Sequence, residues 1–595
     1  MKRKILLATS LTFIQFLAGF SQPVTAYTWW NPAKNNFSVI EGQGWPKEIK
    51  DPYDRLPARA EKNVREPVWN LSHNSAGLLI RFRASTPEII IRYKVANDLA
   101  LPLMPATGVS GVDLYAISSD GTWLWCSANY SFGDTIQYHF SALDPNDTYH
   151  GKGREYRLYL PLYNTVRWME IGVPQGTIFT PLPARMEKPI VVYGTSIAQG
   201  GCASRSGMAW ASILGRKSGR PVINLGFRSN GKLEEELIDL LAEIDAKIYI
   251  LDCLPNMTAS DDTKKRIIAS VNQLRQKRHD VPILLVEHAG YSDGLINSAS
   301  RKNYTDLNKL MKQALEELTS KGVKNIFLLT MEEINLDIDC TVDGVHPSDL
   351  GMLRYADAYE KKIRFILDEP EGIFSTTKPC TQNRDANTYD WETRHNELVA
   401  LNKSDPPRVV FIGNSIINYW GGRPAAKYSR GADSWNKFFE PAGVRNFGFG
   451  WDRIENVLWR VYHDELDGYS AKQIMIMIGT NNLEFNSDEE ISGGLNMLVA
   501  AIKKRQPAAG ILLIGLLPRR EQEQRITRLN KEIAKLSAAV HIEYVDAGKL
   551  LLEKNGKINE SLFSDGVHPN AAGYWKVVQY IKPYLKVPLT MDIPK

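Results

Sequence analysis

The sequence predicts an α/β protein in which two parallel-sheet domains follow a β-sandwich-like module. Three observations support this prediction. Apolar strands alternate with amphipathic helices from residue 189, the alternation restarts near residue 409, and the stretch before residue 186 has short β-branched runs with little helical periodicity. Strands that alternate with helices form parallel sheets covered on both faces. A chain of 595 residues is also too long for one hydrophobic core.

The N-terminal part of the chain divides into a leader and a β-rich module. Residues 1–26 begin with Lys2-Arg3-Lys4, continue in an apolar run and end in Val24-Thr25-Ala26, a layout typical of a secretory signal peptide. We therefore expect an exported protein, periplasmic or secreted, with no membrane span after cleavage. An uncleaved anchor is the alternative, but the apolar run is short for a span. Residues 27–185 are expected to form the β-sandwich-like module. Its strands include residues 89–93, 156–160 and 165–170.

The two α/β regions are expected over residues 186–370 and 406–595. Between them, the polar residues 371–405 are expected to form a linker with a short helix at residues 391–401. Strands of the first region are predicted at residues 190–193, 247–251, 283–286 and 325–329. Strands of the second region are predicted at residues 409–412, 474–478, 511–517 and 542–545.

Four short motifs recur in the same order in the two α/β regions, which indicates a long internal repeat. The first copy reads Tyr193-Gly194-Thr195-Ser196-Ile197, Asn224-Leu225-Gly226-Phe227, Asp252-Cys253-Leu254-Pro255-Asn256 and Asp343-Gly344-Val345-His346-Pro347. The second copy reads Ile412-Gly413-Asn414-Ser415-Ile416, Asn446-Phe447-Gly448-Phe449, Gly479-Thr480-Asn481-Asn482 and Asp565-Gly566-Val567-His568-Pro569. The histidine follows the serine by 150 residues in the first copy and by 153 in the second. Parallel sheets would bring these motifs together at the carboxyl ends of the strands, where such folds bind ligands.

These residue types are those of nucleophilic acyl transfer. A serine hydroxyl becomes a nucleophile when a histidine takes its proton, and an aspartate on the other ring nitrogen fixes the histidine tautomer. Backbone N–H groups and an asparagine amide can stabilise the oxyanion of the tetrahedral intermediate. The expected catalytic residues are Ser196, Asp343 and His346 in the first copy and Ser415, Asp565 and His568 in the second. The expected oxyanion-hole residues are Gly226, Asn256, Gly448 and Asn481.

The motifs resemble those of the SGNH (GDSL) hydrolase superfamily, whose name lists the serine, glycine, asparagine and histidine found here. The resemblance covers about residues 185–370 and 405–590, and it implies two flavodoxin-like α/β/α domains. Thr195 and Asn414 stand where the family usually has aspartate before the serine. The third motif of the second copy is close to the family pattern, and that of the first copy is similar to a subgroup with Asp-Cys-Leu-Pro-Asn.

Two further likenesses refine this resemblance. The second copy is similar to the platelet-activating-factor acetylhydrolase branch, in the loop from Asn446 to Gly450, in Asn456-Val457-Leu458-Trp459-Arg460 and in the segment from Gly479 to Asn482. The β-rich module carries Gly111-Val112-Asp113-Leu114-Tyr115, which is similar to the Gly-x-Asp-Leu-Tyr module found ahead of SGNH esterase domains.

The resemblance implies a serine esterase that needs no cofactor. An exported esterase meets glycans outside the cytoplasm, so the expected substrate is an O-acetylated glycan or sugar. The tandem arrangement resembles exported bacterial sialate O-acetylesterases. The alternatives are an acetylesterase for a plant polysaccharide (xylan, mannan or pectin), a lipid-directed acetylhydrolase, and a glycan-binding protein on decayed esterase domains.

Charge and residue counts argue against a nucleic-acid-binding protein and against a metalloenzyme. The formal charge is +5, of which three cations belong to the leader, so the mature chain lacks the strongly basic character of nucleic-acid-binding proteins. Each copy places one histidine in its motifs, too few for a catalytic zinc site, so no metal is expected. Cys202 and Cys340 could form a disulfide or could be free buried thiols. Several arginines near the motifs could bind a carboxylate, or could be solvated or salt-bridged: Arg205, Arg228, Arg453, Arg519 and Arg520.

Overall fold

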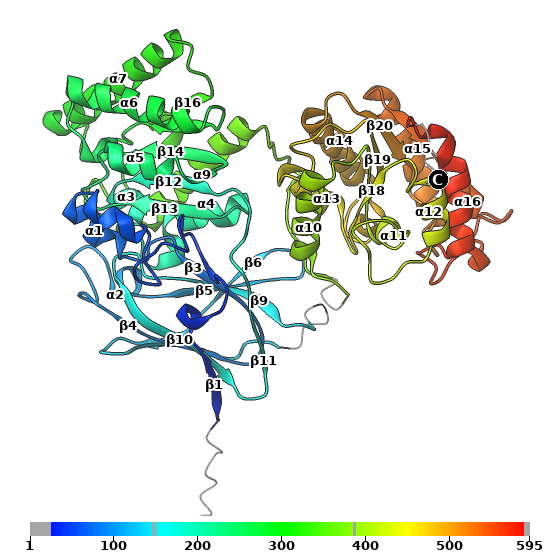
Figure 1. Ribbon diagram of the computed structural model, residues 1–595, viewed down its shortest axis with the longest axis horizontal. Coiled ribbons are helices and arrows are strands. Elements are labelled where there is room, and N and C mark those ends of the chain that lie inside the picture. The colour runs from blue at the N-terminus through cyan, green and yellow to red at the C-terminus, as the bar shows by residue number, and fades with distance from the viewer. Residues whose placement is uncertain (1–24, 146–148, 150, 385–387, 588–595) are drawn as a thin grey trace, which may run out of the picture.

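The computed structural model describes residues 25–145, 149, 151–384 and 388–587. The predicted signal peptide, residues 1–26, lies outside the described residues except for its last two. Figure 1 shows a β-rich module in blue and cyan, a first α/β domain in green above it, and a second α/β domain, coloured olive to red, at their side. The predicted fold class is confirmed.

The β-rich module consists of two antiparallel sheets. The first has the strand order β1-β10-β4-β8-β7 and the second β11-β3-β9-β5-β6, with β2 paired to β3. The strands of the first sheet are β1 (Tyr27–Trp30), β4 (Ile89–Val95), β7 (Asn129–Ser131), β8 (Ile136–Phe140) and β10 (Val166–Pro174). Those of the second are β2 (Ile40–Glu41), β3 (Leu79–Ser85), β5 (Asp113–Ile117), β6 (Trp123–Cys126), β9 (Arg154–Tyr159) and β11 (Ile178–Pro181). Their inward-facing side chains form one core, which makes the module a sandwich.

The first α/β domain has five parallel strands in the order β13-β12-β14-β15-β16. Their bounds are β12 (Ile190–Gly194), β13 (Val222–Gly226), β14 (Ile248–Asp252), β15 (Ile283–Val286) and β16 (Ile326–Leu329). The main helices are α4 (Trp210–Ser218), α5 (Glu235–Leu241), α6 (Asp261–Lys277), α7 (Ser298–Ser320) and α9 (Asp349–Leu367). The first strand in sequence lies between the second and the third, as in flavodoxin-like folds.

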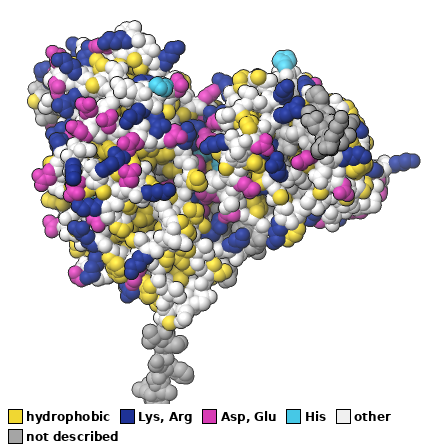
Figure 2. Space-filling model, in the orientation of Figure 1, with side chains coloured by type: hydrophobic (Ala, Val, Ile, Leu, Met, Phe, Trp, Pro, Cys, Tyr) yellow, Lys and Arg dark blue, Asp and Glu magenta, His cyan; other side chains and the backbone are white. Residues whose placement is uncertain are grey.

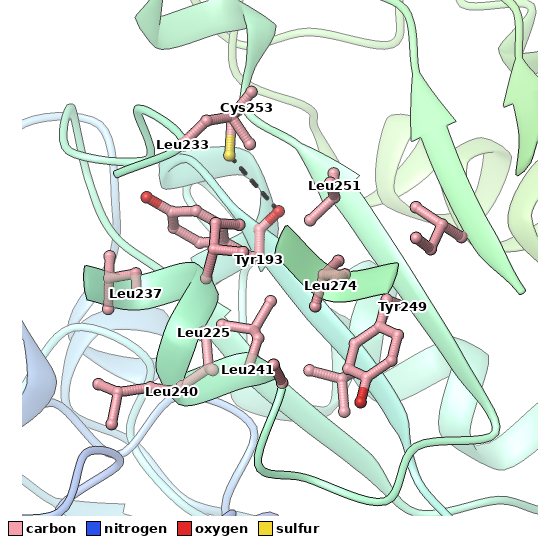
Figure 3. Close-up of a cluster of buried hydrophobic side chains, with 14 of the residues drawn as sticks. Tyr193, Leu225, Leu233, Leu237, Leu240, Leu241, Tyr249, Leu251, Cys253 and Leu274 are labelled. Atoms are coloured by element: carbon pink, nitrogen blue, oxygen red, sulfur yellow. Dashed lines mark hydrogen bonds between the residues drawn. The ribbon is translucent and has the colours of Figure 1, made fainter. Parts of the chain in front are cut away.

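Alternate residues of each strand enter different cores on the two faces of this sheet. Tyr193, Leu225 and Leu251 pack with α5 and α6 on one face, as Figure 3 shows. Val192 and Ile250 pack with α4 and α9 on the other. Because both faces are covered, the strands read as continuous apolar runs, which is the pattern that the sequence showed.

The second α/β domain repeats the topology with the strand order β18-β17-β19-β20-β21, also parallel. The strands are β17 (Val409–Gly413), β18 (Val444–Gly448), β19 (Gln473–Met477), β20 (Gly510–Ile514) and β21 (Glu543–Val545). The main helices are α10 (Trp391–Ser404), α12 (Ala432–Phe438), α13 (Ile454–Tyr462), α14 (Asp488–Arg505), α15 (Glu523–Ala539) and α16 (Ala571–Ile581).

Two of the predicted domain boundaries need correction. Residues 371–405 are more than a linker, because Trp391 and Leu398 of α10 are buried in the core of the second domain. Within residues 27–185, Trp45, Leu56 and Trp69 pack in the core of the first α/β domain rather than in the sandwich. Each α/β domain is therefore completed by a preceding segment, which we call its arm: residues 45–72 for the first domain and 371–404 for the second. Many residues of both arms are polar, so the sequence did not indicate that the arms belong to the domains. A few aromatic and aliphatic side chains of each arm are buried in the domain core.

A buried arginine of each arm binds the backbone of an edge strand, β13 in the first domain and β18 in the second. Arg55 donates hydrogen bonds to the carbonyl oxygens of Asn224 (3.1 Å) and Gly226 (2.8 Å). Arg394 donates to those of Asn446 (3.5 Å) and Gly448 (2.9 Å). Burial lowers the pKa of Arg55 to about 9 and that of Arg394 to about 10. The two arginines occupy equivalent positions, and each binds the carboxyl end of the strand that carries the second motif, at Gly226 or Gly448.

Replacement of Arg394 by alanine should destabilise the second domain. The backbone carbonyls of Pro424 and Asn446 would lose the Arg394 donor, and that of Gly448 would keep only the donor from Asn418 Nδ2 (3.0 Å). Each buried acceptor left unsatisfied costs about 1–3 kcal/mol, so we expect a loss of about 3 kcal/mol or more. For a domain of this size that corresponds to a fall in Tm of about 6–12 °C, measurable by calorimetry. Arg423→Ala is the control, because the Arg423–Asp405 ion pair is exposed and should contribute at most about 1 kcal/mol.

Ion pairs and hydrogen bonds join the second domain to the rest of the molecule. Arg81 of the sandwich pairs with Glu392, and Arg83 pairs with Asp390 at the N-terminus of α10. Lys247 Nζ of the first domain lies 2.7 Å from Asp464 Oδ1 of the second domain. Figure 2 shows Lys and Arg interspersed with Asp and Glu over both α/β domains.

The described residues include no helix with the length and apolar character needed to cross a bilayer. All five cysteines are free thiols, so Cys202 and Cys340 are not bonded to each other. Instead, the Cys340 thiol donates to Asp337 Oδ1 at 3.2 Å.

Candidate active sites

The first candidate site lies at the carboxyl end of β12. Ser196 begins the short helix α3 (Ser196–Gln199), and the Thr195 side chain caps it by accepting from the Ile197 N–H. Ser196 Oγ is 2.9 Å from His346 Nε2, and His346 Nδ1 is 2.8 Å from Asp343 Oδ2. The structure thus brings together three residues that span 150 positions in the chain, with the serine 7% exposed. This geometry suits proton transfer from the serine to the histidine.

The second candidate site repeats this geometry at the carboxyl end of β17. Ser415 begins α11 (Ser415–Asn418), capped by the Asn414 side chain. Ser415 Oγ is 2.8 Å from His568 Nε2, and His568 Nδ1 is 2.9 Å from Asp565 Oδ2. In both copies the residue before the serine acts as a helix cap, which explains why threonine and asparagine stand where the family usually has aspartate.

The aspartates are held in the ionised form. Burial alone would raise the pKa of Asp343, but the backbone N–H and the ring of His346 outweigh it, so the pKa is lowered. Asp565 has a lowered pKa for the same reasons, and Arg430 Nη1 adds a hydrogen bond of 3.0 Å to its Oδ2. Ionised carboxylates can stabilise the imidazolium that forms during acyl transfer.

The pKa of His568 is lowered from its ordinary value. Burial is the main cause, and Arg430 adds to it, while Asp565 acts in the opposite direction. The ring of Tyr419 lies against the imidazole with the ring centroids 5.2 Å apart. His568 is therefore neutral, and able to act as a base, at pH values where an ordinary histidine is partly protonated.

The backbone N–H groups of Gly226 and Gly448 are not available as oxyanion donors, contrary to the sequence prediction. Gly226 N–H donates to Asn224 Oδ1 at 2.9 Å, and Gly448 N–H donates to Asn446 Oδ1 at 2.8 Å. These glycines serve packing instead. A Cβ on Gly448 would lie 2.2 Å from the backbone nitrogen of Asn418. The glycine of the second motif thus allows β18 to pack closely against the short helix that begins with Ser415.

The N–H groups three residues further along each loop are better candidates. Neither Ser229 nor Trp451 donates a backbone hydrogen bond to any residue in the described parts of the chain. Both have the left-handed backbone conformation, with φ of 58° and 63°. These turns could not be predicted from the sequence, because neither serine nor tryptophan favours positive φ.

The predicted asparagines lie on the same rim. Asn256 Oδ1 accepts from Gly231 N–H at 3.2 Å, which orients the side-chain amide and leaves Nδ2 without a partner among the described residues. Asn481 Nδ2 donates one hydrogen to the Asp452 carbonyl at 2.9 Å and keeps the other. Each asparagine thus retains an N–H for a substrate oxyanion.

Replacing either asparagine by alanine should slow the chemical step of its own site. Loss of one oxyanion donor typically costs about 10²–10³ in kcat. Asn481→Ala is measured in a Ser196→Ala chain, and Asn256→Ala in a Ser415→Ala chain, so that one site is assayed at a time. An unchanged kcat would mean that the amide does not contact the oxyanion.

The sandwich also supports the first site, which the sequence did not indicate. Tyr163 OH donates to the Ser196 carbonyl at 2.9 Å. Asp113 of the Gly-x-Asp-Leu-Tyr motif accepts from Trp125 Nε1 (2.7 Å) and from Gly207 N–H (3.1 Å), and it pairs with Arg205. Residues 200–207 follow the nucleophile helix, so this motif anchors the sandwich to the loop beside Ser196.

Two Ser–His–Asp sets at the carboxyl ends of flavodoxin-like sheets define a serine hydrolase. Two family models, each described as the GDSL-like Lipase/Acylhydrolase family, match the sequence, one at residues 187–364 and the other at residues 411–576. Residues 27–179 match the model described as the N-terminus of Esterase_SGNH_hydro-type. The chain belongs to the GDSL-like lipase/acylhydrolase family and is an ester hydrolase.

Characterised and solved proteins give the same assignment. Platelet-activating factor acetylhydrolase IB subunit alpha1 of Bos taurus is 30% identical over 209 residues, which cover 34% of this chain and 85% of that protein. The human alpha2 subunit is 31% identical over 192 residues, covering 31% and 80%. A structure described as a GDSL-like lipase of Bacteroides ovatus ATCC 8483 is 33% identical with a TM-score of 0.53, and it covers 58% of this chain and 98% of that one. The resemblance to platelet-activating-factor acetylhydrolases is confirmed.

Proposed function

We propose that this protein is an exported esterase that removes O-acetyl groups from carbohydrates, with sialic acid as the first choice of sugar. The observation that carries the proposal is a cavity of about 480 Å³ beside Asp343 of the first triad. It is lined by that aspartate, by Gly344 and Val345, and by Tyr291, Asp293, Ala299, Ser300 and Asn303. Its carboxylate, hydroxyl and amide groups suit sugar hydroxyls, and Tyr291, Ala299 and Val345 supply the apolar part of the wall. Export is proposed from the basic and apolar leader.

In the proposed reaction, Ser196 and Ser415 are the nucleophiles. The serine oxygen attacks the acetyl carbonyl as His346 or His568 takes the hydroxyl proton. Collapse of the tetrahedral intermediate breaks the bond to the sugar oxygen, which leaves with that proton. Water then attacks the acetyl-enzyme with the same histidine as base, and acetate and the free serine are formed.

A lipid-directed acetylhydrolase is the second candidate. The identity to platelet-activating factor acetylhydrolase subunits favours it. Plant polysaccharides (xylan, mannan or pectin) remain alternative carbohydrate substrates. A glycan-binding protein on decayed esterase domains is disfavoured by two hydrogen-bonded triads.

Acetate release separates these candidates. The purified protein is assayed with O-acetylated sialic acids, acetylated xylan, mannan and pectin, and an acetylated ether phospholipid. The Ser196→Ala/Ser415→Ala protein serves as the blank. We expect the highest kcat/KM with an O-acetylated sugar, and a clear preference for the phospholipid would overturn the carbohydrate proposal.

A further inference from the structure

Arg228 is an exposed cation on the loop that contains the candidate oxyanion donor of the first site. Its guanidinium makes no hydrogen bond and no ion pair with any residue that the structure describes. Other arginines around this site have partners: Arg205 pairs with Asp113, and Arg65 with Glu234. Arg228 therefore presents an uncompensated positive charge.

The loop backbone places Arg228 beside the nucleophile. Arg228 N–H donates to Gln199 Oε1, at the end of the nucleophile helix, at 2.9 Å. Its carbonyl accepts from Asn230 Nδ2 at 2.7 Å, and the preceding Phe227 N–H donates to the Gly194 carbonyl at 3.0 Å. The backbone on both sides is thus fixed, and the side chain extends from a rigid position.

The electrostatics of Cys202 place the same charge near the triad. Burial and Asp343 raise the pKa of the Cys202 thiol to about 11, and Arg228 acts in the opposite direction. Cys202 follows Gly201, where a Cβ would lie 3.0 Å from the Ser196 carbonyl oxygen and 3.2 Å from His346 Cδ2. The positive charge of Arg228 is therefore felt beside Ser196 and His346 of the first site.

The second site lacks this cation. Gly450 occupies the position equivalent to Arg228, two residues after the matching glycine, and its carbonyl accepts from Gln382 Nε2 at 2.9 Å. Arginines on the loops around the second triad have partners, and Arg453 lies over the Phe485 ring with its Nη1 3.9 Å from Glu455 Oε1. Arg430 contacts Asp565, Arg519 pairs with Glu484 and Arg520 with Glu560. The two sites thus differ in the charge that they offer to a substrate.

We propose that Arg228 binds a carboxylate of the substrate, so that the first site selects O-acetylated acidic sugars. This inference rests on the proposed carbohydrate function and narrows its substrate class. A guanidinium matches the planar geometry of a carboxylate with two parallel hydrogen bonds. Sialic acids and uronic acids both supply such a group. The second site has Gly450 at this position, so it should hydrolyse neutral and acidic acetylated sugars equally well.

The test is a selectivity ratio measured in a Ser415→Ala chain, where only the first site can act. The kcat/KM for an O-acetylated sialic acid is divided by that for its methyl ester, in which the carboxylate is neutral. Arg228→Gln should reduce this ratio by about 10-fold to 100-fold, mainly through KM, because a hydrogen bond to a charged group is worth about 1.5–3 kcal/mol. Arg228→Lys should retain part of the preference.

Arg528→Gln is the control, since Arg528 is exposed on α15 of the other domain. O-acetylated galacturonan and its methyl ester form a second pair, which distinguishes a uronate from a sialate substrate. A preference for galacturonan would contradict the sialate choice and support the role of Arg228. An equal loss on acid and ester, or no loss on either, would overturn the role of Arg228 and leave the esterase function intact.

Binding provides a readout that does not require turnover. In the Ser196→Ala/Ser415→Ala chain, calorimetric titration with the acid and with its methyl ester should show the same preference for the acid. Arg228→Gln should abolish that preference. Equal affinities of the two ligands before the substitution would overturn the proposal.

Discussion

Replacement of both Ser196 and Ser415 by alanine is expected to reduce ester hydrolysis by about 10⁴-fold or more. Each serine hydroxyl is hydrogen-bonded to Nε2 of its own histidine, at 2.9 Å for Ser196 and 2.8 Å for Ser415. Removal of the nucleophile leaves only the contribution of oxyanion stabilisation and binding. Initial rates of acetate release measure the loss.

The single variants assign activity to the sites. Ser196→Ala and Ser415→Ala should each remove the share of activity that its site provides for a given substrate. Substrates that differ in charge should divide between the two variants. If one variant retained the full rate on every substrate, the altered site would not be a catalyst for any of them.

Asp565→Asn should lower kcat of the second site by about 10⁴-fold, because asparagine does not hold the catalytic histidine tautomer. The measurement uses a Ser196→Ala chain and records kcat/KM against pH. The rate falls as pH drops through the His568 pKa, because the base must be neutral. Burial already lowers this pKa, so the acid limb should lie below about 6.5, the ordinary histidine value. Loss of the carboxylate, which raises the pKa, should shift the limb to still lower pH.

Arg430→Gln is the matched control for this shift. Arg430 lowers the pKa of His568, so its removal should move the acid limb to higher pH. Asp343→Asn in a Ser415→Ala chain is the equivalent change in the first site. A limb that stayed in place at an undiminished rate would show that these aspartates do not orient the bases.

The sheets and the hydrogen-bonded triads could be predicted from the sequence because their signals are local. Buried parallel strands are continuous apolar runs, and the serine and histidine motifs sit in turns directly after an element. The conformation of the loop after Gly226 could not be predicted. The Asn224 side chain that binds the Gly226 N–H is oriented by a tertiary hydrogen bond from its Nδ2 to the Ala198 carbonyl (2.7 Å), and serine has no preference for the positive φ of Ser229. The arms could not be predicted either. Arg55 and Arg394 look like surface residues until the carbonyls that they bind are known.

The arms have a consequence for the order in which the chain folds. Arg55 and Gly226 are separated by 171 residues, and the sandwich strands β3 to β11 lie between them in the sequence. Arg394 and Gly448 are separated by 54 residues. Closing the longer loop costs about 1 kcal/mol more in chain entropy. The second domain and its arm are contiguous in the sequence, so we expect this part of the chain to fold on its own, through contacts between residues close in sequence. The first domain gains its arm at a lower entropic cost once the intervening strands have formed, so it and the sandwich should fold as a single cooperative unit.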